Sequence, residues 1–244
     1  MNNHFKARIF VDLPLNVGGQ TALPEEKSHY LTNVMRLKDG DNLVCFNGID
    51  GEFAAKIVSA HKKQTLIVIT EQLRQQQNSP DIWLLFAPLK KDRTDFLIEK
   101  AVELGVTKLV PVITKHTITD KIRPERLKMQ IIEAAEQCER LDIPTLTDAV
   151  KLNDLLNGWN QHRTLYFMDE RGKGQSCAVA FAKKTESAAL LIGPEGGFAD
   201  EEANALYQLP FVNTISLGPR ILRAETAATA SLAIWQAVAG DWKE

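Results

Sequence analysis

The segment "DIWLLFAPLKKDRTDFLIEKAVELG" at residues 81–105 decides how the larger part of this chain folds. It begins with an apolar run at residues 81–89 and continues as an amphipathic stretch at residues 92–105 that ends in glycine. The apolar run predicts a buried strand, and the amphipathic stretch predicts a helix with a glycine stop. A second apolar run, "KLVPVIT", follows at residues 108–114. A strand, a helix and a second strand in this order predict a parallel strand pair joined by the helix.

The same alternation continues toward the C-terminus. Further strands are predicted at residues 164–169, 188–193 and 212–218, and further helices at residues 124–141, 200–209 and 224–240. Sustained alternation of this kind is typical of an α/β domain with a mostly parallel sheet. Ligands of such sheets bind beyond the carboxyl ends of the strands, so the loops at those ends are the first place to look for a site.

The first 73 residues have a different pattern. Segments rich in β-branched and aromatic residues lie between turn signals at residues 8–13, 42–48, 52–60 and 64–73. One helix is predicted at residues 24–37, so this part is expected to form a small β-barrel or sandwich with a single helix. The polar segment "RQQQNSP" at residues 74–80 ends in proline and predicts a linker. The expected domains are therefore residues 1–73 and 81–244.

Composition limits the class of protein. The 244 residues are 44% hydrophobic and 25% charged, with a net charge of −2, as in an ordinary globular protein that does not coat nucleic acid by bulk charge. Cys45, Cys138 and Cys177 form no CxxC motif, which predicts a reducing compartment without disulfides or zinc. No signal peptide or membrane-spanning run is found, so a cytoplasmic location is expected. The five histidines, His116 among them, lack metal-binding spacing and are interpreted as surface or packing residues.

Two glycine-proline loops follow neighbouring predicted strands. "IGPEGGF" at residues 192–198 has neither the GK[ST] of a P-loop nor the GxGxxG of a dinucleotide site, and its proline removes one amide donor. A tight structural turn is the alternative. "LGPRILRAETA" at residues 217–227 is the second loop. Two such loops side by side can form a narrow slot for a flat heterocycle, with Arg220, Arg223 and Glu225 at its mouth. Glu225 also suits a helix N-terminus on electrostatic grounds alone.

Basic residues are predicted on the same rim. "LKKDR" at residues 89–93 and the segment at residues 115–128 both follow strand ends and are locally basic. A solvated face is the alternative interpretation. A basic rim beside a slot for a heterocycle favours a nucleic-acid substrate.

These motifs resemble those of a known family. "IGPEGGF" and "LGPRILRAETA" are similar to the paired C-terminal motifs of the RsmE family in the SPOUT superfamily of RNA methyltransferases. Residues 89–112 resemble its mid-chain signature and residues 29–41 its N-terminal one, so the resemblance spans essentially the whole chain. It implies S-adenosylmethionine as cofactor and methylation of N3 of a uridine in 16S rRNA of the small ribosomal subunit. It also implies a deep trefoil knot in the C-terminal domain, a PUA-like RNA-binding N-terminal barrel, and a homodimer.

The resemblance also implies roles for individual residues. Arg223 and Glu225 are expected at the reacting end, with the Arg223 guanidinium stabilising the charge that spreads onto the uracil oxygens as N3 loses its proton. The cofactor-binding residues implied are Ile192, Gly193, Pro194, Glu195, Gly196, Gly197, Leu217, Gly218, Leu222 and Arg223. The RNA-binding residues implied are Arg8, Arg36, Lys38, Lys90 and Arg93. No metal ligand is implied.

Three other functions are consistent with only part of these motifs. A related methyltransferase acting on a ribose 2′-OH or on another RNA would share the knot and the cofactor. A ribosome-assembly factor without catalytic activity would keep only the RNA-binding face. An NAD enzyme is disfavoured because its fingerprint is missing.

Overall fold

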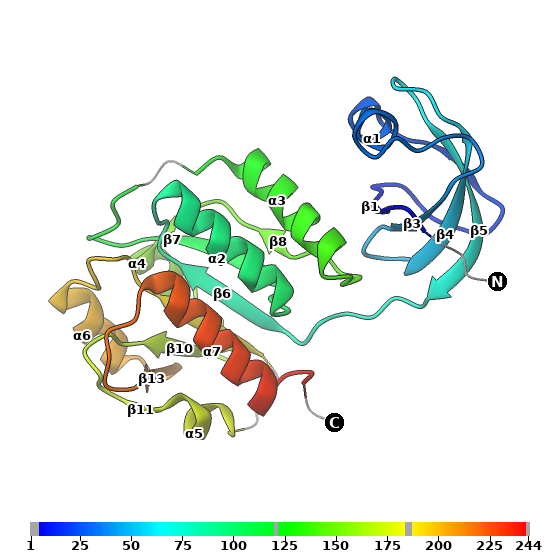
Figure 1. The fold of residues 1–244 in the computed structure, drawn as a ribbon. Coiled ribbons are helices and arrows are strands. Elements are labelled where there is room, and N and C mark those ends of the chain that lie inside the picture. The colour runs from blue at the N-terminus through cyan, green and yellow to red at the C-terminus, as the bar shows by residue number, and fades with distance from the viewer. Residues whose placement is uncertain (1–4, 120–121, 184–186, 243–244) are drawn as a thin grey trace. The chain divides into compact units, whose positions relative to one another are not determined.

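The computed structural model describes residues 5–119, 122–183 and 187–242 (Figure 1). It divides into two compact units. The first contains the chain up to Asn78 together with Ala135–Ile143, and the second contains Ser79–Ala134 and the chain from Pro144 onward. Residues Asp120 and Lys121 of the predicted basic segment lie outside the described residues.

The first unit is built on a β-sheet. Its described strands are β1 (Arg8–Phe10), β2 (Gln20–Ala22), β3 (Asn42–Phe46), β4 (Glu52–Ser59) and β5 (Leu66–Arg74), in the order β1-β3-β4-β5-β2. Strand β1 runs parallel to β3, and the other pairs are antiparallel. Alternate residues of the strands, such as Ile9, Leu43 and Ile67, bury their side chains in one hydrophobic core.

The predicted helix at residues 24–37 is shorter in the structure and changes its winding. It consists of α1 (Glu25–His29) followed by a π-helical turn, η1 (Tyr30–Val34), which places the side chain of Leu31 in the core of the unit. The four predicted strands are present. Strand β2 was not predicted because its three residues, Gln-Thr-Ala, carry no apolar alternation, and it forms by pairing with β5.

The second unit contains a parallel sheet. Its described strands are β6 (Ile82–Phe86), β7 (Lys108–Ile113), β8 (Thr145–Leu146), β9 (Val150–Lys151), β10 (Thr164–Met168), β11 (Gln175–Ser176), β12 (Ala188–Ile192) and β13 (Val212–Ser216). They follow the order β11-β13-β10-β12-β6-β7-β8, with β9 paired to β7, and every pair is parallel. This confirms the predicted α/β domain with a parallel sheet.

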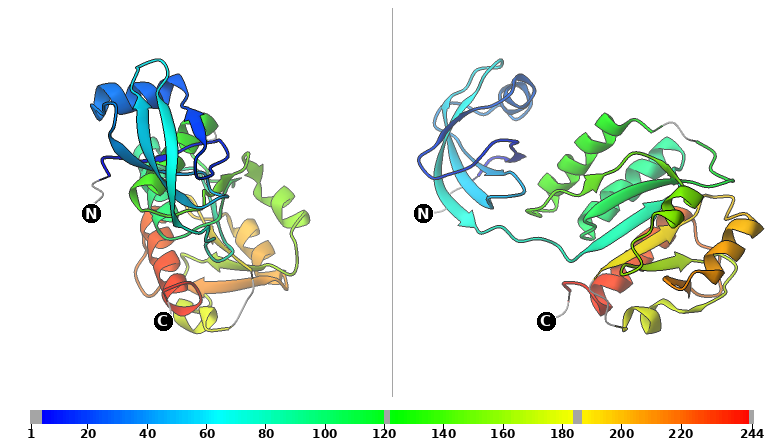
Figure 2. Two further views of the ribbon diagram at one scale, coloured as in Figure 1. Left: turned by 90° about the vertical axis from the view of Figure 1, so that its right-hand side faces the viewer. Right: turned by 180° about the vertical axis from the view of Figure 1, so that it is seen from behind.

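Helices cover both faces of this sheet. The described helices are α2 (Lys91–Glu103), α3 (Pro124–Gln137), α4 (Leu152–Asn157), α5 (Cys177–Phe181), α6 (Asp200–Gln208) and α7 (Ala224–Val238). On one face α7 packs against α2 and α5 (Figure 1). On the other face lie α4 and α6, as the view from behind in Figure 2 shows. The core that they cover includes Leu165, Phe167 and Leu191. None of the helices in the described parts is both long and apolar enough to cross a membrane.

The strand order explains where a site forms. Strand β10 lies between β12 and β13, so the carboxyl ends of these three strands are neighbours in the sheet. Their following loops therefore meet at one edge. Two of them are the predicted glycine-proline loops, and the third, after β10, begins with Asp169 and Glu170.

Candidate active site

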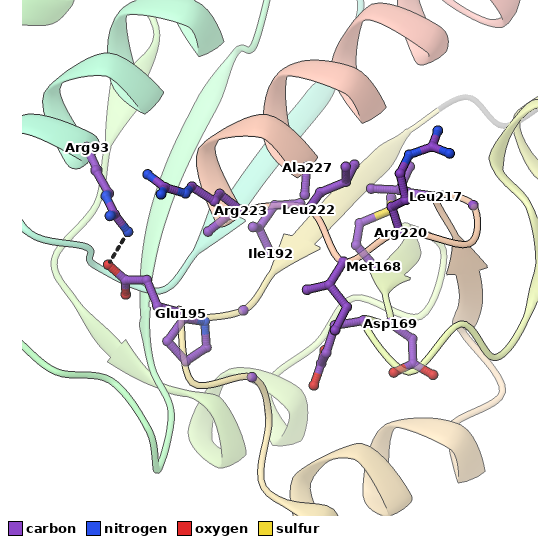
Figure 3. A pocket seen from close by; sticks show the side chains of 17 residues that line it. Arg93, Met168, Asp169, Ile192, Glu195, Leu217, Arg220, Leu222, Arg223 and Ala227 are labelled. Atoms are coloured by element: carbon purple, nitrogen blue, oxygen red, sulfur yellow. Dashed lines mark hydrogen bonds and ion pairs between the residues drawn. The ribbon is translucent and has the colours of Figure 1, made fainter.

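A cavity of about 420 Å³ opens where the loops after β10, β12 and β13 meet (Figure 3). Such a volume falls within the range of small-molecule sites. The cavity is lined by Arg93, Met168, Asp169, Glu170, Ile192, Gly193, Pro194, Glu195, Gly197, Leu217, Gly218, Arg220, Ile221, Leu222, Arg223, Ala224 and Ala227. Its wall thus combines aliphatic side chains with both carboxylates and guanidinium groups.

The glycine loop, Gly193–Phe198, needs glycine at two positions. A Cβ on Gly193 would lie 2.5 Å from the ring of Phe198, which is buried against Phe167. Gly197 has a φ of 69°, and a Cβ there would lie 2.5 Å from Glu170 Oε1. A side chain at either position would therefore displace the loop from its neighbours.

Side chains from two other loops hold the glycine loop in place. After β10, Glu170 Oε1 accepts a hydrogen bond from the Phe198 amide (3.2 Å), and Arg171 donates to the Phe198 carbonyl (2.8 Å). After β7, the Nδ1 atom of His116 lies 3.1 Å from the carbonyl oxygens of both Gly196 and Gly197. The backbone that lines this side of the cavity is therefore fixed from outside the loop.

The second loop, Leu217–Arg223, is held much less. Its Gly218 has a φ of 103°, and within the described residues an added Cβ would have no heavy atom closer than 4 Å beyond its chain neighbours. The hydrogen bond from the Gly218 amide to the Ser216 hydroxyl is long, at 3.3 Å. Ile221 lines the cavity although the residue is 84% exposed. The side chain of Arg220 points away from Arg93 in Figure 3.

Charged groups gather where the two loops approach α2. Arg93 Nη1 lies 3.4 Å from Glu195 Oε1, and its Nε lies 3.8 Å from Glu225 Oε1. Glu225 Oε2 is buried without a hydrogen-bond partner within the described residues. Arg223 extends from the start of α7 toward the side on which Arg93 lies (Figure 3). Its guanidinium makes no ion pair with any residue that the structure describes.

Asp169, directly after β10, contributes a carboxylate to the cavity wall between the two glycine-proline loops. The residue is 4% exposed, and its carboxylate accepts hydrogen bonds from the Tyr207 hydroxyl (2.8 Å) and the Arg171 amide (3.1 Å). Burial, and then the hydrogen bond to Asp169, raise the pKa of Tyr207 to about 12. Tyr207 on α6 therefore stays a hydrogen-bond donor that fixes this carboxylate.

Most of the residues implied for the cofactor lie in the cavity wall. They are Ile192, Gly193, Pro194, Glu195, Gly197, Leu217, Gly218, Leu222 and Arg223, and Arg93 lies there as well. Gly196 and Glu225 are not part of the wall: Gly196 faces His116, and Glu225 lies behind, beside Arg93. Met168, Asp169 and Glu170 were not predicted from the sequence, although the predicted strand at residues 164–169 ends in Asp169 and is followed by Glu170.

Arg8 does not support the RNA contact expected for it. Its Nε donates to Glu52 Oε1 (2.7 Å), and its two terminal nitrogens donate to the carbonyls of Ala135 (2.9 Å) and Arg140 (2.8 Å). The side chain is 12% exposed and lies over the Phe46 ring. Its donors serve the first unit itself. Burial would raise the pKa of the Glu52 carboxyl, but the hydrogen bonds from Arg74 and Arg8 outweigh it and hold that pKa below its usual value.

Of the other cations expected to bind RNA, Arg36, Lys38 and Lys90 are exposed, and Arg93 is half-buried in the cavity wall. Arg36 has a left-handed φ of 56° and Lys38 follows close by, both in the first unit. Lys90 directly precedes α2 in the second unit. In the part of the chain that the structure describes, no group of three or more His, Cys, Asp or Glu side chains could hold a metal ion.

Two family models match the chain. Residues 76–236 match an RNA methyltransferase domain, and residues 23–70 match the PUA domain of RNA methyltransferases. The class of protein is therefore that of the RNA methyltransferases, and the N-terminal unit is a PUA domain.

Individual relatives show which family of RNA methyltransferases the chain resembles. Ribosomal RNA small subunit methyltransferase E of Rickettsia conorii is 34% identical over 228 residues, 93% of each chain. A crystal structure of the Neisseria gonorrhoeae protein of that name, bound to S-adenosyl methionine, matches with a TM-score of 0.88, 27% identity and coverage of 98% of this chain and 100% of that one. A putative methyltransferase from Legionella pneumophila, also with bound cofactor, matches with a TM-score of 0.87, 34% identity and 97% and 99% coverage. The chain belongs to the ribosomal RNA small subunit methyltransferase E family, which confirms the resemblance seen in its motifs.

Proposed function

We propose that this protein transfers a methyl group from S-adenosylmethionine to N3 of a uridine in 16S rRNA. The observation that carries the proposal is that two glycine-proline loops line one cavity, with Arg223 at its edge and no ion-pair partner for its guanidinium among the described residues. Family membership supports the reaction class, since the relative from Neisseria gonorrhoeae is described with this cofactor bound.

The residues present fit this cofactor. Ile192, Leu217 and Leu222 offer an apolar surface for a flat heterocycle, and Asp169 and Glu170 offer carboxylates to the polar, positively charged part. S-adenosylmethionine supplies a methyl group on a positively charged sulfur. The glycine loop would contact the cofactor through its backbone. Gly193 and Gly197 carry no side chain, and the neighbouring atoms leave no space for one.

Arg223 is assigned to the transition state. Uridine N3 becomes nucleophilic only when its proton leaves, and the negative charge then spreads onto the adjacent carbonyl oxygens. A guanidinium fixed beside them stabilises this charge without reorganisation. Arg223 suits the role because its backbone carbonyl accepts the first hydrogen bond of α7, from Ala227 (2.8 Å), while its side chain remains unpaired within the described residues.

Glu225 is assigned a supporting role behind the cavity. Its carboxylate lies beside Arg93 and keeps one buried oxygen without a partner in the described residues. It can accept a hydrogen bond from the Arg223 guanidinium and so hold that side chain in place when the substrate binds. We therefore assign Glu225 to orienting Arg223, with Arg93 balancing the charge of the carboxylate.

Substrate binding is proposed to use both units. Arg36 and Lys38 of the PUA domain and Lys90 at the rim of the second unit are exposed cations suited to phosphate contacts. Arg8 is left out of this set because its donors are already engaged. We further propose that the protein acts as a cytoplasmic homodimer on the small ribosomal subunit, and that the second unit carries the trefoil knot of its superfamily.

The deciding experiment uses purified protein, labelled S-adenosylmethionine and small ribosomal subunits from cells that lack the gene. The rRNA is digested, and its nucleosides are separated and identified by mass. Labelled 3-methyluridine is the expected product. A labelled ribose-methylated nucleoside would keep the fold and cofactor but overturn the reacting atom, and absence of label from subunits and bare rRNA would overturn the substrate.

A further inference from the structure

His116 is an exposed residue that sequence reasoning assigned to the surface, yet its ring is aimed at the wall of the cavity. Its Nδ1 atom lies 3.1 Å from the Gly196 carbonyl oxygen and 3.1 Å from the Gly197 carbonyl oxygen. Both partners can only accept a hydrogen bond, so Nδ1 must carry the proton and donate to both. The contact thus defines the tautomer of the ring.

The two carbonyls belong to consecutive peptide groups that are also held at their other ends. In the peptide that joins Gly196 to Gly197, the N–H donates to the Pro194 carbonyl at 3.0 Å. In the peptide that joins Gly197 to Phe198, the N–H donates to Glu170 Oε1 at 3.2 Å. Each peptide plane is therefore fixed at its C=O by His116 and at its N–H by another group. Glycine itself gives no such restriction, since it has the greatest backbone freedom of any residue.

We propose that His116 is a positioning residue for the cofactor, acting through the backbone of the glycine loop; this rests on the proposed function. Donation from Nδ1 keeps the loop in the one arrangement that shapes the cavity wall at Gly197. Without it, two glycines in sequence regain rotational freedom that cofactor binding must then remove. His116 does not touch the reacting atoms, so its loss acts on cofactor affinity rather than on the chemical step.

The test compares three substitutions. In asparagine the amide nitrogen occupies nearly the place of Nδ1, whereas in glutamine it lies one bond further away, and alanine has no donor. His116→Ala and His116→Gln are expected to weaken S-adenosylmethionine binding, measured by calorimetry without RNA, by about five- to tenfold. His116→Asn is expected to restore binding to within about twofold. His162→Ala serves as the control because His162 is an exposed histidine that lies outside the cavity wall.

Two further readouts separate positioning from a general loss of fold. In steady-state assays KM for S-adenosylmethionine should rise in the alanine variant while kcat and KM for RNA stay near wild type. Nitrogen NMR of the wild-type ring should show Nδ1 protonated at neutral pH. Equal cofactor binding by wild type and His116→Ala, or equal losses in the Asn and Gln variants, would overturn the inference. A wild-type protein that binds no S-adenosylmethionine would instead overturn the proposed function.

Discussion

The two glycine-proline loops of the cavity are similar in sequence but differ in how the protein holds them. The loop at Gly193–Phe198 is fixed by His116, Glu170 and Arg171, which come from two other loops. The loop at Leu217–Arg223 has few such contacts, and its Ile221 is 84% exposed. One wall of the cavity is therefore set before any ligand arrives, and the other can still adjust.

This difference suits the two loops to different ligands. A wall that is fixed in advance binds a ligand without a further ordering cost, which suits a cofactor that every turnover requires. A loop with free side chains can close over a substrate and complete the site afterwards. Arg223 lies at the junction, because its backbone begins α7 while the residues before it belong to the loosely held loop.

The largest expected effect is that of Arg223→Ala. Loss of a preorganised donor at the developing charge should lower kcat by about 10²- to 10³-fold, while S-adenosylmethionine affinity changes by less than about threefold. Steady-state methylation assays and calorimetry measure the two quantities. Arg220→Ala is the matched control for turnover, since Arg220 is a second arginine of the same loop and cavity wall but points away from Arg93, so kcat should stay near wild type. If Arg223→Ala retained near-normal turnover, the role assigned to this guanidinium would be wrong.

Alanine at Gly197 and at Gly218 tests the comparison directly. Both glycines have positive φ, so alanine strains the backbone at either one by on the order of 1 kcal/mol. At Gly197 the new Cβ would also displace Glu170 and its hydrogen bond to Phe198, whereas at Gly218 it would meet no atom of the described residues within 4 Å beyond its chain neighbours. Gly197→Ala should therefore reduce cofactor affinity by about tenfold or more and lower the unfolding temperature. Gly218→Ala should cause a smaller loss of cofactor affinity and a smaller drop in the unfolding temperature. Equal losses measured by calorimetry and thermal unfolding would show that the two loops are held alike.

The fold could be predicted largely from the sequence because its main elements carry strong local patterns. The apolar runs at β6, β7, β10 and β12 and the amphipathic helices α2 and α7 identify themselves by periodicity. The missed elements are short. Strand β11 has two residues, Gln175 and Ser176, and exists because it pairs with the end of β13. Pairing between distant segments leaves no signal in such a short stretch of chain.

The site could be predicted in part for the same reason. The two glycine-proline loops are local motifs, and most of their residues do line one cavity. The roles of His116, Glu170 and Arg8 depend on partners that lie 80, 28 and 44 residues away in the sequence, which local reasoning cannot supply. Arginine is a common residue type at RNA contacts, so Arg8 was a reasonable candidate. The structure shows instead that Arg8 forms an ion pair with the buried Glu52 of its own domain.

A smaller effect is expected from Arg93, which lies between the two loops. Its ion pairs with Glu195 and Glu225 are long and its side chain is 35% exposed, so they contribute little to stability. Arg93→Met removes one positive charge from the cavity wall and should favour the positively charged S-adenosylmethionine over neutral S-adenosylhomocysteine by about threefold. Calorimetry with both ligands, without RNA, measures this ratio.

Lys90→Met is the matched control for that charge. Lys90 lies on the same rim but outside the cavity wall, so its loss should weaken RNA binding and leave the ratio of the two cofactor affinities unchanged. If Arg93→Met also weakened RNA binding without changing the ratio of the two cofactor affinities, Arg93 would have the RNA-binding role expected from the sequence.

The smallest effect concerns Tyr207, which supports the fixed side of the cavity from behind. Its pKa is raised from 10.0 to about 12 in the folded protein, so the neutral hydroxyl is favoured by folding. That contribution to stability is complete below about pH 10, and it is lost as the pH rises from about 10 toward 12 because the unfolded chain gives up the proton first. Tyr207→Phe should therefore be less stable than wild type at pH 8, and this difference should shrink as the pH approaches 12. Urea unfolding of both proteins at a series of pH values measures it, and subtraction removes the titration of lysines that both proteins share. A difference that stayed constant up to pH 12 would mean that the hydroxyl bonded to Asp169 is not held in its neutral form by the fold.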